Sequence, residues 1–536
     1  MLDGSVGECV NVSGAGSVPE GELGGAASAD QEAPHGSSHL VGDHDDRFVR
    51  RPYWAMIVDV HRVGAVIALL SFFGIVYART LNSGGMFMWD EAEYASIGRS
   101  VLRGDGFAIS GKPNPLRPPV LPLAGAASMR LAGSTADEVV KRPTLGFSLL
   151  ALLVVYACAA TVYGWETGLA AASLLGVSPG FWISTPLFMT EIPFMACFCG
   201  AIVAFHLGLY RDSRFFVLAW ACWGLAFLTR YTAVVFAPIT VVLIALSLLD
   251  GDVRVRQRLF SRAFLLAPIA ALILVVPWLV RQQLTFGDAL VGMKQASMQL
   301  QLFLPDQAMP WYFYPVRLLP MLSPGVAVLA IAGTAWALSQ RDRLAIHCLA
   351  TAAVVIAWFS FFRFKEDRQI TAVLPLLAIV AGTGLVKFFA PARETSRSWA
   401  LRIVALALVF GLNFRATRPA LEYRVALGYP GFLRAMHWLS AHAPTDAAVL
   451  AANYPQVFWY ADRRALDFPD EAGLRDALRQ TEWVVLTNFE RGQKAYAAAL
   501  TRLVTTEDTR RGDAAIFRDA LFETIVVRSS VLLARL

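Results

Sequence analysis

The feature that most restricts the fold of this chain is a series of long runs without charged residues. Such runs, roughly 20 residues long, recur between short charged clusters, and about 20 helical residues span the roughly 30 Å hydrocarbon layer of a bilayer. Apolar residues make up 56% of the sequence and charged residues only 16%, whereas a soluble domain is about a quarter charged. The sequence therefore predicts a polytopic α-helical membrane protein.

We expect about eleven membrane crossings. They lie near residues 62–81, 116–131, 143–163, 190–210, 215–229, 231–249, 263–280, 314–338, 344–363, 369–390 and 400–416. Cationic residues collect on the cytoplasmic side of membrane proteins. We therefore place the N-terminus in the cytoplasm, together with the basic connectors 130–142, 211–214, 254–262, 341–343 and 393–402.

The apolar stretch 164–189 is predicted to be a broken or re-entrant segment. Its glycines and prolines, among them Gly164, Gly176 and Pro179, interrupt a continuous helix. A twelfth full crossing at this point would also move 211–214 and every later basic connector to the other side of the membrane. The prediction therefore keeps eleven crossings, with external loops at 82–115 and 281–313.

The two ends of the chain differ in composition from the membrane region at 49–416. Residues 1–48 are rich in Gly, Ser, Ala and acids, which is typical of a disordered tail, here cytoplasmic. From 417 to 536 charges return, and helix-like segments alternate with strand-like ones at 447–452, 483–486 and 514–517. This alternation predicts a small α/β domain, on the external or periplasmic side of the plasma membrane.

The net charge of +6 and the six cysteines exclude some functions. The basic residues form short loop clusters and no basic face, so we expect no nucleic-acid partner. Cys197 and Cys199 are too close in sequence for a usual zinc site and have no nearby His partners. The sequence assigns no certain cofactor and leaves a divalent metal open.

The first external loop places three acids within four residues, at Asp90, Glu91 and Glu93. The dipole of a helix favours acids in its first turn, which is a structural explanation for Glu93. Asp90 directly follows an apolar run that ends at Trp89. A carboxylate against an apolar surface has a raised pKa and can act as a general base, so we predict that Asp90 is catalytic.

Several more charges interrupt apolar sequence on the same predicted side. They are Arg117, Glu191, Arg230 and a basic cluster of Arg363, Lys365 and Arg368. The structural alternatives are an arginine at the membrane interface for Arg117 and pairing of the cluster with Glu366 and Asp367. Cations stabilise a departing phosphate and a carboxylate accepts a proton. The set therefore suits group transfer from a membrane-anchored phosphate ester.

These residues also lie in motifs that resemble a known family. The ordered set resembles the C-superfamily (GT-C) membrane glycosyltransferases, in particular the bacterial relatives of dolichyl-phosphate-mannose protein O-mannosyltransferases and the lipid A aminoarabinose transferase. The motifs are Trp89-Asp-Glu-Ala-Glu-Tyr-Ala95, Arg117-Pro-Pro, Ser178-Pro-Gly180, Thr190-Glu-Ile-Pro193, Phe227-Leu-Thr-Arg230 and Lys365-Glu-Asp-Arg-Gln369.

The resemblance implies a GT-C-like fold, a polyprenyl-phosphate-linked sugar donor, inverting transfer and an external active site. It makes Asp90 the expected base. Glu191 stands where the family usually has Asp, and Arg117 and Arg230 stand where it often has Lys. The charge is retained, and a guanidinium group binds phosphate through two N–H groups.

The predicted enzyme transfers a hexose or pentose to a hydroxyl of a glycan, lipid or protein. We expect the catalytic carboxylates to be Asp90, Glu91 and Glu191. The expected ligands of the donor phosphate are Arg117, Arg230, Lys365 and Arg368. Further substrate contacts are expected from Glu93, Tyr94, Lys112 and Tyr231. One alternative is a transporter or flippase of a lipid-linked sugar, whose key charges would lie near mid-membrane. Another is a receptor-like protein that binds through 417–536.

Overall fold

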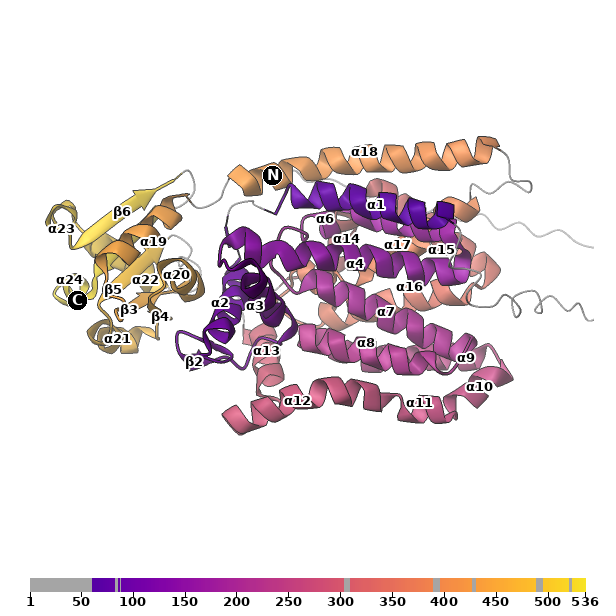
Figure 1. Ribbon diagram of the computed structural model, residues 1–536, viewed down its shortest axis with the longest axis horizontal. Coiled ribbons are helices and arrows are strands. Elements are labelled where there is room, and N and C mark those ends of the chain that lie inside the picture. Colours follow the sequence, from indigo (N-terminus) through magenta and orange to yellow (C-terminus); the bar gives the residue numbers. More distant parts are fainter. Residues whose placement is uncertain are drawn as a thin grey trace, which may run out of the picture. The chain divides into compact units, whose positions relative to one another are not determined.

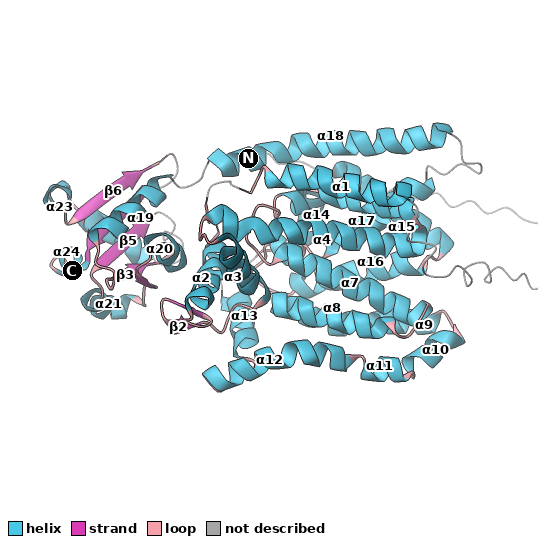
Figure 2. Cartoon of the chain, in the orientation of Figure 1, coloured by secondary structure: helices cyan, strands magenta, loops and turns pink. Residues whose placement is uncertain are grey.

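The computed structural model describes residues 60–81, 85–86, 88–302, 309–388, 396–426, 430–487, 495–519 and 523–536. The predicted tail at 1–48 lies outside the described residues. The described chain is mostly helical, with a small sheet near its C-terminal end (Figure 2). The predicted class, a polytopic helical membrane protein with a C-terminal α/β region, is confirmed.

Seven stretches of helix among the described residues are long and apolar enough to cross a membrane. They belong to α1 (Val60–Ala78), α4 (Asp137–Tyr163), α7 (Glu191–Tyr210), η3 with α9 (Tyr231–Val235 and Phe236–Leu249), α11 with α12 (Arg262–Leu266 and Pro268–Phe286), α16 (Arg343–Ser360) and α18 (Ser396–Ala426). An eighth results if α14 (Phe313–Leu322) and α15 (Pro324–Gln340), bent by 108° at Ser323, form one span.

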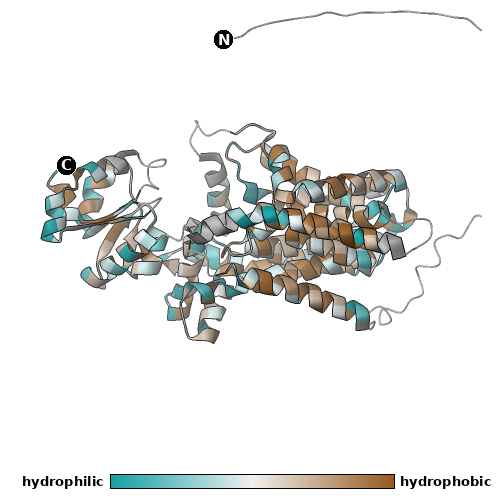
Figure 3. Cartoon of the chain, turned by 90° about the horizontal axis from the view of Figure 1, so that it is seen from above, coloured by the Kyte–Doolittle hydropathy of each residue, from teal (hydrophilic) through white to brown (hydrophobic). Residues whose placement is uncertain are grey.

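The remaining predicted crossings correspond to shorter apolar helices, α3 (Val120–Ala132), α8 (Phe215–Thr229) and α17 (Val373–Phe388). The other helices of this region are α2 (Trp89–Arg103), α5 (Trp165–Val177), α6 (Pro179–Trp182), α10 (Val253–Leu259) and α13 (Val291–Leu302). Figure 1 shows the long helices side by side, with α2 and α3 at one end of the bundle, and Figure 3 shows the apolar character of the bundle. We call this end the α2 end and the opposite one the Arg343 end.

Helix α3 lies beside α2 at one end of the bundle and is not the crossing predicted at 116–131 (Figure 1). It packs closely on α2, because a Cβ added at Gly98 would lie 2.7 Å from the carbonyl oxygen of Pro122. The chain then enters α4 at Asp137, which bonds Trp459 and Tyr460 of the C-terminal region. The connector 130–142 therefore lies at the α2 end, and its predicted place beside the other basic connectors was wrong.

The segment 164–189 is broken, as predicted, because α5 begins after Gly164 and ends before Ser178 and Pro179. It is not re-entrant. At the start of α5, Glu166 pairs with Arg402 near the start of α18, and near its end the carbonyl of Gly176 accepts a hydrogen bond from Tyr77 at the end of α1. The segment therefore connects the two ends of the bundle.

These two differences from the predicted topology cancel each other. One predicted crossing, α3, does not cross, and the segment predicted not to cross does. The basic connectors 211–214, 254–262 and 341–343 consequently lie together at the Arg343 end. Arg343 stacks on the ring of Tyr210, 4.6 Å from its centre, and pairs with Asp250 at 3.1 Å.

The C-terminal region contains a five-stranded sheet with the order β4-β3-β5-β7-β6. Its strands are β3 (Ala448–Ala451), β4 (Arg464–Leu466), β5 (Trp483–Thr487), β6 (Ala514–Arg518) and β7 (Glu523–Arg528). Strand β3 is parallel to β4 and β5, whereas β7 is antiparallel to β5 and β6. The predicted boundary at 417 falls inside α18, which continues to Ala426.

Helices cover both faces of this sheet. The side chains of β5 alternate, so Trp483 and Val485 join one apolar cluster and Val484 and Leu486 the other. The first cluster includes α19 (Pro430–His442) and α20 (Tyr454–Ala461); the second includes α21 (Leu474–Gln480), α22 (Ala495–Leu500) and α24 (Ser529–Leu533). A short α23 (Thr506–Arg511) precedes β6, and a small hairpin of β1 (Ala108–Ile109) and β2 (Lys112–Pro113) follows α2.

Helix α20 fastens the C-terminal region to α2. Arg99 of α2 donates hydrogen bonds to the carbonyl oxygens of Phe458 (2.6 Å) and Trp459 (2.8 Å) in the last turn of α20. Trp89, the first residue of α2, meets Tyr454, the first residue of α20, edge to face. The helix that carries the three predicted acids is thus held along its length by the C-terminal region.

Candidate functional site

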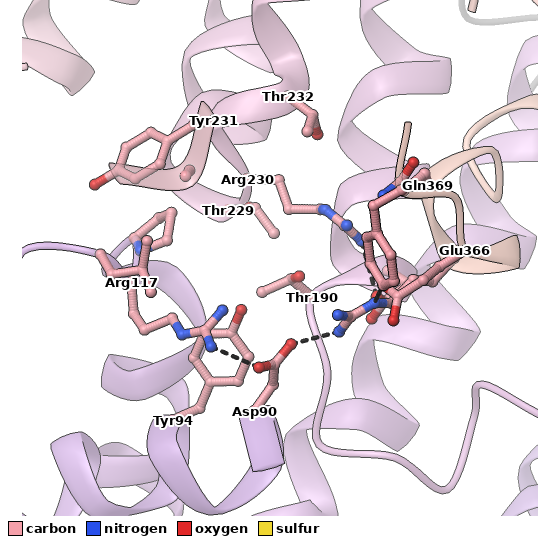
Figure 4. Close-up of a pocket in the computed structure, with 16 residues that line it drawn as sticks. Asp90, Tyr94, Arg117, Thr190, Thr229, Arg230, Tyr231, Thr232, Glu366 and Gln369 are labelled. Carbon is pink, nitrogen blue, oxygen red and sulfur yellow. Dashed lines mark hydrogen bonds and ion pairs between the residues drawn. The ribbon is translucent and has the colours of Figure 1, made fainter. Parts of the chain in front are cut away.

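A cavity of about 150 Å³ lies at the α2 end, where several helices begin or end (Figure 4). Its charged lining comes from five segments: Asp90 from the first turn of α2, Arg117 from the segment before α3, Glu191 from the first position of α7, Arg230 from the end of α8, and Glu366 and Arg368 from the segment before α17. The cavity therefore brings together residues that the sequence analysis placed on one side of the membrane.

Asp90 bridges two guanidinium groups. Its Oδ1 accepts a hydrogen bond from Nη2 of Arg117 at 2.5 Å, and its Oδ2 accepts one from Nη1 of Arg368. Burial acts to raise the pKa of Asp90, but Arg117 and Arg368 outweigh burial and hold this pKa well below its usual range. The raised pKa predicted from the neighbouring apolar run was wrong, because both cations come from outside that run.

Glu93 and Asn114 hold Arg117 in place on the side away from the cavity. Its Nε donates to Glu93 Oε2 at 2.6 Å, and Asn114 donates to the other oxygen of Glu93 at 2.9 Å. The Asn114 side-chain oxygen also accepts hydrogen bonds from the backbone N–H groups of Leu116 and Arg117 at 3.0 Å. Glu93 does not line the cavity, so its geometry is that of a residue that positions Arg117.

Asn114 was not among the residues predicted for the site. A signal was present, since Asn side chains commonly accept hydrogen bonds from backbone N–H groups two or three residues later. Its place between Pro113 and Pro115 marks a turn of this kind.

Glu191 and Arg230 form a further ion pair, at 2.8 Å, and both residues line the cavity. The second oxygen of Glu191, Oε2, is buried and has no hydrogen-bond partner. A buried, unpaired carboxylate oxygen is costly, so this atom is well suited to accept a hydrogen bond from a ligand.

The basic cluster before α17 is divided between different partners. Arg368 pairs with Glu366 as well as with Asp90, and Asp367 pairs with Arg317 outside the cavity. The structural alternative, local pairing with neighbouring acids, thus holds in part for Arg368. Lys365 does not reach the cavity, because its amino group donates to the carbonyl oxygens of Phe362 and Met309.

Glu91 and Lys112 also lie away from the cavity. Glu91 is fully buried and accepts hydrogen bonds from the backbone N–H groups of Met88 and Phe188, both at 2.8 Å, and Lys141 lies 3.5 Å from it. It therefore joins the start of α2 to the loop before α7, outside the cavity that Asp90 lines. Lys112 is exposed on β2.

Tyr94 and Tyr231 line the cavity, as do several residues that the sequence analysis did not select. The ring of Tyr94 lies under the Arg117 guanidinium, 5.2 Å from it. The hydroxyl of Tyr231 accepts a hydrogen bond from Trp278 at 3.0 Å. The unselected lining residues include Thr190, Thr229, Thr232, Glu366 and Gln369. Within the described ranges, no group of three or more His, Cys, Asp or Glu side chains is placed to hold a metal ion.

Two family models match parts of the chain. The dolichyl-phosphate-mannose-protein mannosyltransferase family matches residues 116–280, and the Alg9-like mannosyltransferase family matches residues 308–425. A relative from Proteus mirabilis, undecaprenyl phosphate-alpha-4-amino-4-deoxy-L-arabinose arabinosyl transferase 2, is 26% identical over 345 residues. That match covers 60% of this chain and 58% of the length of the relative.

Two solved structures share the fold. ArnT from Cupriavidus metallidurans bound to undecaprenyl phosphate matches with a TM-score of 0.68 and 14% identity, over 87% of this chain and 98% of that chain. The archaeal oligosaccharyltransferase AglB from Archaeoglobus fulgidus, in complex with an inhibitory peptide and a dolichol-phosphate, matches with a TM-score of 0.55 and 13% identity, over 81% and 71%. The chain thus shares the fold of these two solved structures, as the resemblance predicted.

Proposed function

We propose that this multi-span membrane protein transfers a sugar from a polyprenyl-phosphate-linked donor to an acceptor hydroxyl, in the cavity at the α2 end. The observation that carries the proposal is the gathering of three guanidinium groups and three carboxylates around one cavity. The fold adds support, as do the names of the relatives, which refer to undecaprenyl phosphate and dolichol-phosphate.

In this proposal Arg117, Arg230 and Arg368 bind the donor phosphate. A guanidinium group matches phosphate geometry with two parallel N–H groups. Negative charge builds up on the phosphate as its bond to the sugar breaks, and cations fixed beforehand around that position lower the barrier. Glu93 and Asn114 keep Arg117 in place for this role.

Asp90 is the proposed base. The acceptor oxygen attacks the anomeric carbon of the sugar and its proton passes to the Asp90 carboxylate. The bond between the anomeric carbon and the phosphate oxygen breaks at the same time, and the polyprenyl phosphate leaves with the electron pair. The inverting stereochemistry is carried over from the family resemblance. The unpaired Oε2 of Glu191 is proposed to accept a hydrogen bond from a hydroxyl or amino group of a substrate.

The position of the charges favours this enzyme over the transporter alternative. Glu191, Arg230 and Arg368 each lie at the first or last turn of an apolar helix or just before one, all at the α2 end. A transporter needs its key charges near mid-membrane and reachable from both sides.

We also propose that the α2 end and the C-terminal sheet face the outside of the plasma membrane or the periplasm. The short basic connectors 211–214, 254–262 and 341–343 lie at the opposite end. Short basic loops of this kind are typical of the cytoplasmic side. The acceptor, whether a glycan, lipid or protein, then approaches from outside.

The test is sugar transfer by the purified full-length protein. Undecaprenyl-phosphate-linked hexoses and pentoses serve as donors with a membrane extract as acceptor source, and released undecaprenyl phosphate is measured. We expect release by the wild type and at least about a hundredfold less by Asp90→Asn, since general base catalysis contributes roughly 10²–10⁴-fold.

Asp367→Asn is the matched control, because it removes the same charge from a residue that pairs with Arg317 outside the cavity. It should retain the wild-type rate. Full activity of a correctly folded Asp90→Asn protein would exclude Asp90 as the base. Movement of the lipid-linked sugar across a vesicle membrane without release of undecaprenyl phosphate would favour the transporter.

A further inference from the structure

Each guanidinium group that lines the cavity already has a carboxylate partner. Arg117 pairs with Asp90, Arg368 with Asp90 and Glu366, and Arg230 with Glu191. Three cations and three anions line the cavity, so their formal charges sum to zero. An anionic donor that enters the cavity therefore has to compete with carboxylates for the N–H groups.

The carboxylates differ in how they hold the cations. Glu93 lies behind Arg117 with its side chain only 3% exposed, and Asn114 fixes it there. Glu366 holds Arg368 from a residue two positions earlier in the same segment. These two carboxylates anchor the guanidinium groups from their own sides, so both cations keep a partner if Asp90 leaves.

Asp90 has a different position, between the two anchored cations. Each of its oxygens accepts a hydrogen bond from a different guanidinium group, and the two arginines come from segments far apart in the sequence. A phosphate group has the same ability to place one oxygen on each of two guanidinium groups, and with stronger, charge-assisted bonds. The carboxylate thus has the geometry of a phosphate bridging Arg117 and Arg368.

We propose that Asp90 holds the position that the donor phosphate takes on binding, so that binding is an exchange of one anion for another. This inference rests on the proposed function. The phosphate oxygens take the N–H groups of Arg117 and Arg368, and the Asp90 carboxylate is released toward the acceptor hydroxyl. No covalent bond changes in this step.

The exchange makes donor binding the event that activates the base. A carboxylate held by two guanidinium groups is a weak base, because both cations favour its ionised form. Once phosphate takes these cations, Asp90 loses most of that stabilisation and accepts a proton more readily. The base is then available only when a donor is bound.

The test measures binding of undecaprenyl phosphate to the purified full-length protein in detergent micelles by calorimetry, with undecaprenol as the uncharged control ligand. Replacing Asp90 by Asn removes the competing charge but keeps its size. We expect Asp90→Asn to bind undecaprenyl phosphate at least about tenfold more tightly than the wild type, a change equal to about 1.4 kcal/mol. Asp367→Asn, which also removes one negative charge nearby, should bind like the wild type.

A second variant, Asp90→Ala, covers the case in which Asp90→Asn does not fold, since it removes the same carboxylate without leaving an amide between the two guanidinium groups. It too should bind more tightly than the wild type. Equal or weaker binding by the folded variants overturns the exchange, and so does equal tightening by Asp367→Asn, which indicates a general charge effect. A wild-type protein that does not distinguish undecaprenyl phosphate from undecaprenol instead overturns the proposed function.

Discussion

The contact between α2 and α20 gives a prediction whose size follows from the structure. Arg99 is 5% exposed and places its guanidinium group at the C-terminal end of α20, where it donates to two backbone carbonyls. Cations at this end of a helix also interact favourably with the helix dipole. The ring centres of Phe458 and Trp459 lie 5.0 and 4.7 Å from the guanidinium carbon.

Arg99→Met retains most of the apolar stem but removes both hydrogen bonds. Hydrogen bonds that involve a charged group contribute roughly 1.5–3 kcal/mol each. Part of that gain is offset by burial of the cation, which lowers the pKa of Arg99 to about 10 and leaves it charged at neutral pH. We therefore expect a net loss of about 3 kcal/mol, most of it from the two carbonyls left without a donor.

Arg103→Met is the matched control, one helical turn later in α2. Arg103 bonds Asp462 through two nitrogens, both at 2.9 Å, but both side chains are nearly half exposed. Such surface pairs contribute about 1 kcal/mol or less. The comparison thus sets a buried cap, which also lies 3.3 Å from Asp462, against an exposed ion pair with the same carboxylate.

The assay is thermal unfolding of the detergent-purified full-length protein, together with the sugar-transfer rate. Arg99→Met should lower the Tm by several degrees and reduce transfer, since α2 carries Asp90, whereas Arg103→Met should change both only slightly. An Arg103→Met protein that loses as much stability as Arg99→Met would show that burial does not decide the strength of this contact.

Three further outcomes are expected. Arg117→Lys keeps the charge but loses the two-nitrogen contact with Asp90 and Glu93, so kcat/KM should fall roughly 10²-fold, while a wild-type value would show that charge alone suffices. Glu91→Gln should lower the free energy of unfolding by about 2 kcal/mol, because the amide satisfies only one of the two backbone N–H groups. The sugar-transfer rate per folded molecule should change little, and loss of that rate would show that Glu91 is catalytic. Asp90 should stay ionised in the free protein as the pH falls to its ordinary pKa of about 3.9, because Arg117 and Arg368 outweigh the burial that raises its pKa. The acidic limb of the pH profile should then lie at higher pH for kcat, which reports the substrate-bound enzyme, than for kcat/KM, which reports the free enzyme. Coincident limbs would contradict the exchange.

The fold was predictable from sequence to the level of its class, because hydrophobic run length alone reports membrane helices. The path of the chain was less accessible. A stretch such as 116–131 is apolar enough for a span, yet α3 lies on α2 at the end of the bundle. Conversely, the glycines and prolines of 164–189 break the helix without turning the chain back. In both cases the composition indicates a buried segment, but it does not indicate whether the chain crosses the membrane there.

The site was predictable in its charges but not in its pairings. Asp90 and Arg368 are 278 residues apart, and nothing local in the sequence indicates that they meet. Among the three acids of α2, helical geometry held an unused signal, since residues three or four apart share a face. Asp90, Glu93 and Tyr94 lie toward Arg117, whereas Glu91 points elsewhere.

The close packing of α2 on α3 at Gly98 determines which part of the cavity can change its width. Asp90 belongs to α2, and Arg117 directly precedes α3, so the backbone contact at Gly98 makes them parts of one rigid piece. Arg368 belongs to a separate segment before α17. The ion pair between Asp90 and Arg368 therefore joins this piece to the segment before α17, and a side chain larger than hydrogen at residue 98 would loosen the part of the cavity wall that is built to stay fixed.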